Sequence, residues 1–229
     1  DNHATVKKRD DALSREALVL LQLGRYDEAL EIYDENHFNF WEGVRTVISI
    51  FMDANIMRGI QRYNEGDYSG ALEDFKMSFA FPPNVDMGKP YAMPRYAEVY
   101  YYTGLALEAL GDKKEAREYF HNSISENADN SIYLYYQGLA YEKLKDSIEA
   151  ERSFDKLNQF ASRERGFEGN TQFSVRGTEQ EWLSNKFYAT GLYLMAKDNM
   201  DEAKESFSQA VDTNPHLWAS FWLKEKFNQ

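Results

Sequence analysis

The distribution of apolar positions predicts a chain built from amphipathic helices. In the segment from Ile132 to Leu144, apolar residues recur at steps of three and four, which is the period of one helix face. Similar runs lie on both sides of short polar turns along most of the sequence, so neighbouring helices are expected to form hairpins. The pattern therefore predicts an all-α fold.

A pattern of four positions recurs five times and keeps its register. A small residue is followed after seven residues by Gly or a polar turn residue, after five more by Ala, and after four more by an aromatic residue. Successive instances are 42, 45, 34 and 53 residues apart, which fits a unit of 34 residues with insertions of 8, 11, 0 and 19. The instances are Ala17/Gly24/Ala29/Tyr33, Gly59/Gly66/Ala71/Phe75, Gly104/Gly111/Ala116/Phe120, Gly138/Lys145/Ala150/Phe154 and Gly191/Asp198/Ala203/Phe207.

Each position of this pattern has a physical role in a helical hairpin. The small residue of the first helix and the Ala of the second let the two helices approach closely, and the aromatic residue is expected to fill the space toward the next hairpin. Asp67, Asp112 and Asp146 stand where an Asp side chain can accept hydrogen bonds from the first turn of a second helix. Thr178 followed by Glu181 is typical of a capping box that opens a first helix.

These residues resemble the tetratricopeptide repeat (TPR), and the resemblance covers nearly the whole chain. In that family a helix-turn-helix of about 34 residues ends in a proline, and Pro83 and Pro215 stand where two repeats should end. The chain departs from the family pattern in two places. Leu20 and Asn36 occupy usual core positions of the first repeat, and Lys145 stands where Gly is usual.

The resemblance implies one right-handed TPR superhelix, an α-solenoid of about five helical hairpins, over residues 1–229. A terminal helix over residues 216–228 carries Trp218 and Trp222 and is expected to cap the exposed end of the array. The expected repeats span about 10–43, 52–85, 97–130, 131–164 and 184–217.

The three insertions are expected to differ in structure. Residues 44–51 continue into the next apolar run and predict a longer first helix for the second repeat. The prolines and glycine in and around residues 86–96 predict a turn-rich loop. Residues 165–183 predict a long loop that either joins two elements or has a function of its own, and Phe167 and Phe173 favour docking on the helices.

A second, narrower resemblance concerns the segments HFNFWEG, residues 37–43, and FPPNVDMGKP, residues 81–90. The pair is similar to the helical C-terminal portion of large bacterial proteins, common in gut Bacteroidetes, whose uncharacterised N-terminal domain looks like a galactose-mutarotase or carbohydrate-enzyme β-sandwich. The resemblance implies that this chain is the TPR part of a longer, glycan-related protein, and the start at Asp1 fits that view. It assigns no sugar binding to this segment. The positions that carry it are Trp41, Glu42, Gly43, Pro83, Asn84 and Gly88.

Composition and charge narrow the function further. With 26 Lys and Arg against 38 Asp and Glu, the net charge is −12, which argues against nucleic acid or an anionic membrane as the partner. The absence of Cys excludes disulfides, thiolate metal sites and a cysteine nucleophile. The most apolar stretch, residues 44–57, is interrupted by Arg45 and Asp53 and is too short to span a membrane. We expect a soluble protein without a signal peptide in this segment, and the compartment stays open between bacterial cytoplasm and periplasm.

The sequence offers little catalytic chemistry. The four His residues have no second His or Cys at helical ligand spacing, which argues against a protein-made zinc site. Motifs for a nucleophile elbow, a phosphate-binding loop or an EF-hand do not occur. We therefore expect no catalytic residues, no metal, no cofactor and no enzymatic activity.

The first helix of each hairpin supplies the candidate binding residues. By analogy with TPR proteins, three successive turns of these helices face a concave groove, and the positions are Ile56, Tyr101, Tyr135 and Tyr188, then Ile60, Leu105, Leu139 and Leu192, then Tyr63, Glu108, Glu142 and Met195. The tyrosines have two open interpretations: rigid contacts for a ligand, or packing between helices. Lys and Asn, which clamp acidic tails in chaperone-binding TPR domains, are absent from these positions, so a basic or apolar ligand suits the acidic chain better. The preferred groove residues are Tyr63, Tyr101, Glu108, Tyr135, Glu142 and Tyr188.

Three functions remain open at this level. The first is a non-catalytic interaction scaffold whose groove binds a peptide, a helix or an adjacent domain of its own parent chain. The second is a helical accessory domain of a carbohydrate-processing or carbohydrate-binding parent protein, in which Trp41 and the loop after Phe81 contribute aromatic rings. The third is a homodimer formed through the aromatic C-terminal helix, which requires Trp218 and Trp222 to be exposed together.

Overall fold

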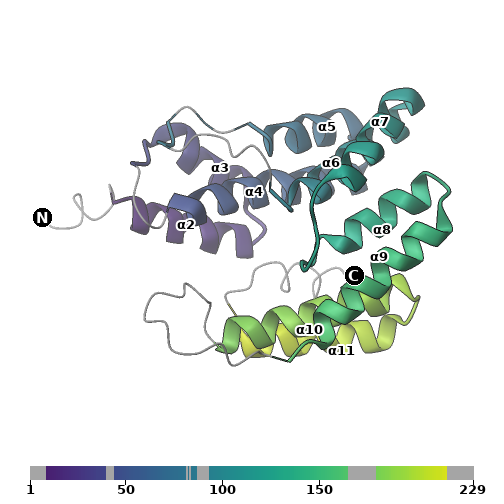
Figure 1. Cartoon of the computed structure of the whole chain (residues 1–229). Helices are drawn as coiled ribbons and strands as arrows, with labels where there is room; N and C mark the ends of the chain where they lie inside the picture. The colour runs from purple at the N-terminus through teal and green to yellow at the C-terminus, as the bar shows by residue number, and fades with distance from the viewer. Residues whose placement is uncertain are drawn as a thin grey trace, which may run out of the picture. The chain divides into compact units, whose positions relative to one another are not determined.

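The computed structural model describes residues 9–39, 44–80, 82, 84–86, 93–164 and 179–215. Ten helices lie in these residues, and the described chain has no strand (Figure 1). The prediction of an all-α fold is confirmed. The helices are α2 (Asp10–Gln22), α3 (Tyr26–Glu35), α4 (Val44–Glu65), α5 (Tyr68–Met77), α6 (Tyr96–Leu110), α7 (Lys113–Ser125), α8 (Leu134–Lys143), α9 (Ser147–Ser162), α10 (Glu179–Ala196) and α11 (Met200–Thr213).

The helices pair into antiparallel hairpins that belong to two compact units. Unit 1, residues 1–127, contains the hairpins α2/α3, α4/α5 and α6/α7, and unit 2, residues 128–229, contains α8/α9 and α10/α11. Within a unit, the second helix of one hairpin packs against the first helix of the next, as α3 does on α4, α5 on α6 and α9 on α10. This is the packing of an α-solenoid. A single continuous solenoid over both units stays a prediction, and the expected terminal helix at 216–228 lies outside the described residues.

The five hairpin turns have the same geometry although their sequences differ. In every turn, one backbone N–H donates a hydrogen bond to the carbonyl of the residue five positions earlier, at 2.9 Å. The donor is two residues after the last N–H that bonds in the α-helical pattern of the first helix. The residue before that donor has a positive φ, between 56° and 90°. These residues are Gly24, Gly66, Gly111, Lys145 and Asp198. Lys145 and Asp198 therefore adopt a backbone conformation that favours glycine, which explains why the sequence pattern has Gly in the other three turns.

Aspartate caps begin three of the second helices. Asp67 Oδ1 accepts a hydrogen bond from the Gly70 N–H at 2.9 Å, Asp112 Oδ1 accepts from Glu115 at 3.3 Å, and Asp146 Oδ1 accepts from Glu149 at 3.2 Å. The three predicted caps are confirmed. The predicted capping box at Thr178 lies outside the described residues.

Close contact between a glycine and a phenylalanine joins the two helices of four hairpins. A Cβ atom placed on Gly138 would lie 2.2 Å from Cε1 of Phe154, and one placed on Gly59 would lie 2.6 Å from Cε1 of Phe75. The pairs Gly104–Phe120 and Gly191–Phe207 have the same contact, at 2.6 and 2.5 Å. The ring thus occupies the volume that a side chain on the first helix would need.

This geometry corrects the expected role of the aromatic position. We expected the ring to fill the space toward the next hairpin, but it lies first on the glycine of its own hairpin. Two of the rings also reach the next hairpin: Tyr33 is 5.3 Å from Phe51, and Phe75 is 5.4 Å from Tyr102, between ring centroids. Each ring therefore contributes to packing inside a hairpin, and in unit 1 two rings contribute to the stacking of hairpins.

In two hairpins, a serine side chain donates a hydrogen bond to a buried backbone carbonyl of the other helix, at the end of the hairpin opposite the turn. Ser123 on α7 donates to the Ala97 carbonyl of α6 at 2.8 Å, and Ser184 on α10 donates to the Ala210 carbonyl of α11 at 2.9 Å. The two bonds occupy equivalent places in the repeat, seven residues before the glycine and three after the phenylalanine, but the donor lies on opposite helices. Either helix can thus supply the donor that closes the open end of a hairpin.

The glycine contact makes a direct prediction for Gly138. Replacing Gly138 with Ala should destabilise the protein by about 1–3 kcal/mol, because the new methyl group overlaps the Phe154 ring. The free energy of unfolding from urea titration measures the effect. In the double variant Gly138→Ala/Phe154→Leu, the smaller side chain makes room for the methyl group, so the loss should be smaller than the sum of the two single losses. Strictly additive losses would contradict the proposed overlap.

At Lys145, which has a positive φ, substitution by glycine is expected to raise the free energy of unfolding. Lys145→Gly should stabilise the protein by about 0.5–1 kcal/mol, because relief of the left-handed backbone outweighs the added entropy of the unfolded chain. The reverse change at an equivalent turn, Gly111→Lys, should destabilise the protein by a similar amount. Thermal and urea unfolding of both variants give the comparison, and a loss of stability in Lys145→Gly would show that the lysine side chain has a separate role.

Candidate functional site

The predicted groove residues lie on the first helices of four hairpins, in two groups. Unit 1 carries Tyr63 on α4, and Tyr101 and Glu108 on α6. Unit 2 carries Tyr135 and Glu142 on α8, and Tyr188 on α10. The candidate site is therefore described as one surface on each unit.

The three tyrosines of the first groove position lie against the phenylalanine of their own hairpin. The ring centroids are 6.1 Å apart for Tyr101 and Phe120, 6.2 Å for Tyr135 and Phe154, and 5.6 Å for Tyr188 and Phe207. Tyr135 and Tyr188 keep 8% and 3% of their surface exposed, whereas Tyr101 is half-buried. These three tyrosine rings pack against the core phenylalanines, which fixes their positions. We call them the aromatic floor, and it lies beside the next two helical turns of each first helix.

The next two turns of α6 and α8 are more accessible, whereas on α10 the residue one turn further, Leu192, is buried. Leu105 on α6 and Leu139 on α8 are half-buried, and Glu108 and Glu142 are exposed. Met195 on α10 is also half-buried. Partial burial and the nearby charge of Asp198 raise the pKa of Glu142 above its ordinary value. The accessible part of the surface is thus aliphatic with an acidic border, and it lies toward the hairpin turns.

Unit 1 differs at the corresponding position of α4. Ile56 and Ile60 are buried there. Tyr63 is half-buried, and its ring packs edge-on against Tyr68 at a centroid distance of 5.1 Å. The accessible surface of α4 at this face is therefore smaller than that of α6.

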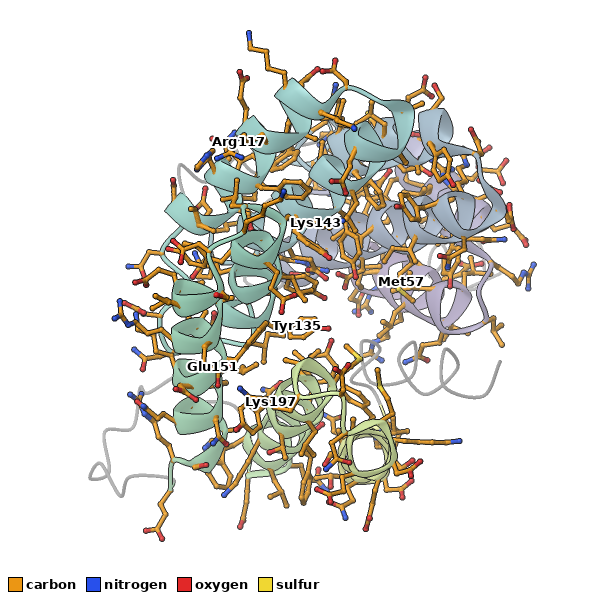
Figure 2. All side chains as sticks on the ribbon, turned by 90° about the vertical axis from the view of Figure 1, so that its right-hand side faces the viewer. Met57, Arg117, Tyr135, Lys143, Glu151 and Lys197 are labelled. Carbon is orange, nitrogen blue, oxygen red and sulfur yellow. The ribbon has the colours of Figure 1, made fainter. Side chains whose placement is uncertain are left out.

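Lys197 connects the two hairpins of unit 2 beside this surface. Its ammonium group pairs with the Glu151 carboxylate of α9, and Figure 2 labels both side chains. The same ammonium group lies 5.6 Å from the ring centroid of Tyr193 and 6.0 Å from that of Phe154. The hydrogen bond to Glu151 raises the pKa of Lys197, so the lysine stays charged at neutral pH. This contact holds the end of α10 against α9.

The structure brings together the two segments of the narrower sequence resemblance. The Phe38 N–H donates to the Asn84 carbonyl at 2.8 Å, and the Asp86 N–H donates to the Phe38 carbonyl at 2.9 Å, which makes a parallel β-bridge between Phe38 and Val85. The Asn84 side-chain amide donates to the carbonyls of Tyr33 and Asn36. Of the positions that carry the resemblance, Asn84 therefore has a defined structural role. Trp41, Glu42, Gly43, Pro83 and Gly88 lie outside the described residues.

A buried charge cluster in unit 1 was missed by sequence analysis. Asp53 on α4 is fully buried and forms an ion pair with Arg95, at the start of α6. Arg95 Nε also donates to Glu98 Oε2 at 3.1 Å. In the sequence, Asp53 appears as an interruption of an apolar run, and Arg95 lies within the insertion at residues 86–96, so no regular spacing connects them. The cluster fixes α6 to α4.

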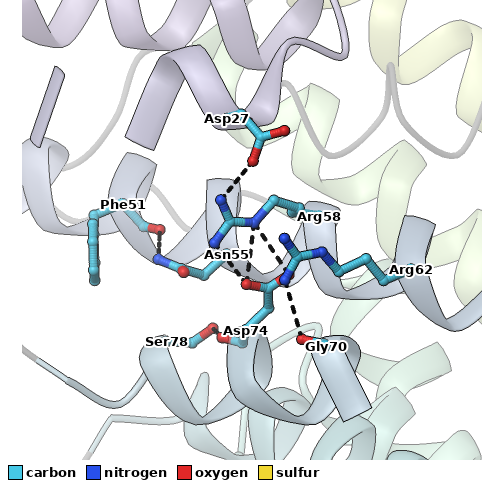
Figure 3. Close-up of polar contacts among 8 residues, drawn as sticks. All are labelled: Asp27, Phe51, Asn55, Arg58, Arg62, Gly70, Asp74 and Ser78. Atoms are coloured by element: carbon cyan, nitrogen blue, oxygen red, sulfur yellow. Dashed lines mark hydrogen bonds and ion pairs between the residues drawn. The ribbon is translucent and has the colours of Figure 1, made fainter. Parts of the chain in front are cut away.

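A second charge cluster joins the first two hairpins of unit 1 (Figure 3). Arg58 Nη2 lies 2.7 Å from Asp74 Oδ1, Arg58 Nη1 lies 2.7 Å from Asp27 Oδ1, and Arg62 Nη1 lies 3.1 Å from Asp74 Oδ2. Burial raises the pKa of Asp74, and the hydrogen bonds from Arg58 oppose that rise. Arg58 and Asp74 are 16 residues apart, like their neighbours Gly59 and Phe75, so the repeat register could have revealed this pair.

Neither cluster has the form of a catalytic or metal site. Their carboxylates are paired with arginines, which makes them structural. Among the described residues, no group of three or more His, Cys, Asp or Glu side chains is placed to hold a metal ion. A search of the same residues for a helix with the length and apolar character of a membrane span also found none.

Comparison with family models identifies repeats in both units. Residues 97–130, which contain α6 and α7, match a model of the tetratricopeptide repeat, and residues 187–217, which contain most of α10 and α11, match another. The chain thus contains TPR repeats, one in each unit, as the sequence pattern indicated.

The solved structures that this chain matches include those of two proteins. The first is YrrB, described as a TPR protein with an unusual peptide-binding site; it is 16% identical, the match covers 96% of this chain and 93% of that one, and the TM-score is 0.36. The second is MamA, which is 19% identical, with 84% of this chain and 90% of that one covered and a TM-score of 0.32.

The buried pair of Asp53 and Arg95 makes a stability prediction. Arg95→Met should destabilise the protein by about 3–5 kcal/mol, because it leaves the Asp53 carboxylate buried without its counter-charge. The double variant Asp53→Leu/Arg95→Met should recover part of that loss, because Asp53 no longer needs a counter-charge while Glu98 still lacks its arginine, and urea unfolding measures the recovery. As a control, Arg152→Met removes an exposed ion pair with Glu149 and should change stability by less than about 1 kcal/mol. Equal losses in Arg95→Met and Arg152→Met would disprove the role of burial.

Proposed function

We propose that the chain is a non-catalytic interaction module that binds a protein segment on the first helices of its hairpins. TPR repeats are present, and TPR folds generally mediate contacts with proteins or peptides. The segment bound is a peptide, a helix or an adjacent domain of the parent chain. The surfaces that bind it are Tyr63, Tyr101 and Glu108 in unit 1, and Tyr135, Glu142 and Tyr188 in unit 2.

The observation that carries the proposal is the fixed aromatic floor with accessible residues beside it. Tyr101, Tyr135 and Tyr188 are held against phenylalanines of the core, so they lose little freedom when a ligand binds. Leu139 and Glu142 stand one and two turns further along α8, one half-buried and the other exposed. A ligand would therefore meet a rigid base, an aliphatic contact and a carboxylate at its border.

The charge of this surface favours a basic or mixed basic and apolar ligand. Glu142 and Asp198 come from successive hairpins of unit 2 and repel each other, which contributes to the raised pKa of Glu142. A cation on the ligand would relieve that repulsion, and the net charge of −12 favours its approach at a distance.

Selection of binding peptides tests the proposal without knowledge of the natural partner. Peptides selected from a random phage library on the full chain should be enriched in Lys, Arg and apolar residues. Their affinity should fall at least about fivefold in Glu142→Lys, because the variant places like charges together. The control Glu205→Lys makes the same charge change on the second helix α11 and should leave the affinity within about twofold. Equal losses in both variants would count against the first-helix surface.

A second candidate is a helical accessory domain of a carbohydrate-related parent protein. The β-bridge between Phe38 and Val85 supports it, since it makes the two segments of that resemblance one structural feature. The sequence encoded upstream of Asp1 tests this candidate. A β-rich domain of several hundred residues there would support it, and an immediate start codon would contradict it. The homodimer through the terminal helix also stays a proposal, because Trp218 and Trp222 lie outside the described residues.

A further inference from the structure

The segment between α7 and α8 contains a backbone conformation that an L-residue rarely adopts. Among the described residues, Asn130 alone has a positive φ outside the five hairpin turns, at 59°. Asparagine tolerates the left-handed region better than most residues, although that region is still less stable for it than the right-handed one. Asn130 is also exposed. It is therefore a strained residue whose side-chain amide is accessible to solvent.

The backbone nitrogen that follows Asn130 does not belong to a helix. Helix α8 begins at Leu134, and the N–H of Ser131 makes no hydrogen bond to a described residue. The Ser131 hydroxyl donates to the Ala128 carbonyl at 2.6 Å and accepts from the Tyr133 N–H at 3.3 Å, so the hydroxyl group holds this turn. The Ser131 nitrogen can therefore approach the side chain of the residue before it without breaking a helix.

The same dipeptide occurs in α7 in a different environment. Asn122 is also exposed and is also followed by a serine, but both residues lie inside α7, which runs to Ser125. Ser123 is buried, and its hydroxyl donates to the Ala97 carbonyl. A backbone nitrogen within a helix is held by its own hydrogen bond and can approach the preceding side chain only after that turn of the helix opens. The two Asn-Ser sequences therefore differ in the freedom of the serine nitrogen.

We propose that Asn130 is a site of spontaneous deamidation, with water as the second reactant. The Ser131 nitrogen gives its proton to solvent and forms a bond to Cγ of the Asn130 side chain, and the amide nitrogen of that side chain leaves as ammonia. The product of this step is a cyclic succinimide. Water then opens the ring at one of its carbonyl carbons, which breaks that carbon's bond to nitrogen and yields aspartate or isoaspartate. In sum, an amide and a water molecule become a carboxylate and an ammonium ion, and no oxidant or reductant is needed.

The reaction adds charge and length to the chain just before α8. Either product carries a carboxylate that is ionised at neutral pH. It stands next to Asp129, whose own carboxylate pairs with Lys156 at 3.2 Å. The isoaspartate product also routes the main chain through the former side chain, which inserts one methylene group before the turn held by Ser131. The beginning of α8 is therefore the part of the chain that this modification alters.

Peptide mapping of the folded full chain tests the proposal with an internal control. Trypsin cuts after Arg117 and Lys143, so one peptide contains both Asn122 and Asn130, and fragmentation of that peptide in a mass spectrometer locates the change. After incubation in mildly alkaline buffer, a mass gain of about 1 Da should accumulate at Asn130 at least about tenfold faster than at Asn122, because α7 must first open at Asn122. Equal rates at the two sites, or a faster reaction at Asn122, would overturn the proposal.

The unfolded chain separates the effect of the fold from that of the local sequence. In guanidinium chloride the two rates should agree within about threefold, because neither serine nitrogen is then held by a helix. A difference of about tenfold that persists in the unfolded chain would show that neighbouring residues set the rate, and it would contradict the structural argument.

The product and one variant identify the attacking nitrogen. Isoaspartate forms through the succinimide, so an isoaspartyl methyltransferase should label residue 130 after the incubation. Ser131→Thr keeps the hydroxyl that bonds to Ala128 and places a branched Cβ beside the nitrogen, so it should slow the reaction at Asn130 at least about threefold. An unchanged rate in this variant, or a wild-type product that contains aspartate alone, would overturn attack by the Ser131 nitrogen and with it the proposal.

Discussion

The contact between a backbone glycine on one helix and a phenylalanine ring on the other is the interaction on which four of the described hairpins depend. The ring lies where the glycine lacks a side chain, so the helices pack at a distance that no larger residue would permit. Ala17 and Tyr33 take the same two places in the first hairpin, where the tyrosine also donates to the Val47 carbonyl at 2.8 Å. Because the ring is fixed in this way, the residues around it have fixed positions too. The tyrosines of the first groove position rest on these rings, and the surface proposed for binding begins there.

Stacking of the hairpins requires a second set of contacts, and these differ from joint to joint. In unit 1, Arg58 pairs with the exposed Asp27 between the first and second hairpins, and the buried Arg95 pairs with the buried Asp53 between the second and third. In unit 2, the joint between α9 and α10 uses Lys197 with Glu151 and two aromatic rings. Such contacts contribute specificity of arrangement more than net stability, since desolvation of the charges offsets much of their attraction. The hairpins are therefore alike, while the joints between them are individual.

This difference explains what the sequence could reveal. The helices, the turns at Lys145 and Asp198, and the caps at Asp67, Asp112 and Asp146 follow from local rules that repeat along the chain, so the register predicted them. The ion pair between Asp53 and Arg95 depends on an insertion of irregular length, so no spacing pointed to it. The burial of Tyr135 and Tyr188 could not be decided from their position, because a tyrosine on a first helix suits both packing and binding. The contact of each tyrosine with the phenylalanine of its own hairpin depends on how the two helices pack, and the spacing of residues along the sequence does not give that packing.

The β-bridge at Phe38 and Val85 has a mechanical consequence for the first two hairpins. It joins the chain segments that follow α3 and α5, and the side chain of Asn84 adds further bonds from the second segment to the first. Stacked hairpins can rotate slightly relative to one another. Rotation of the first two hairpins would have to break the two backbone hydrogen bonds of the bridge together, so these hairpins form a stiff pair. The bridge therefore resists rotation of the first hairpin relative to the second.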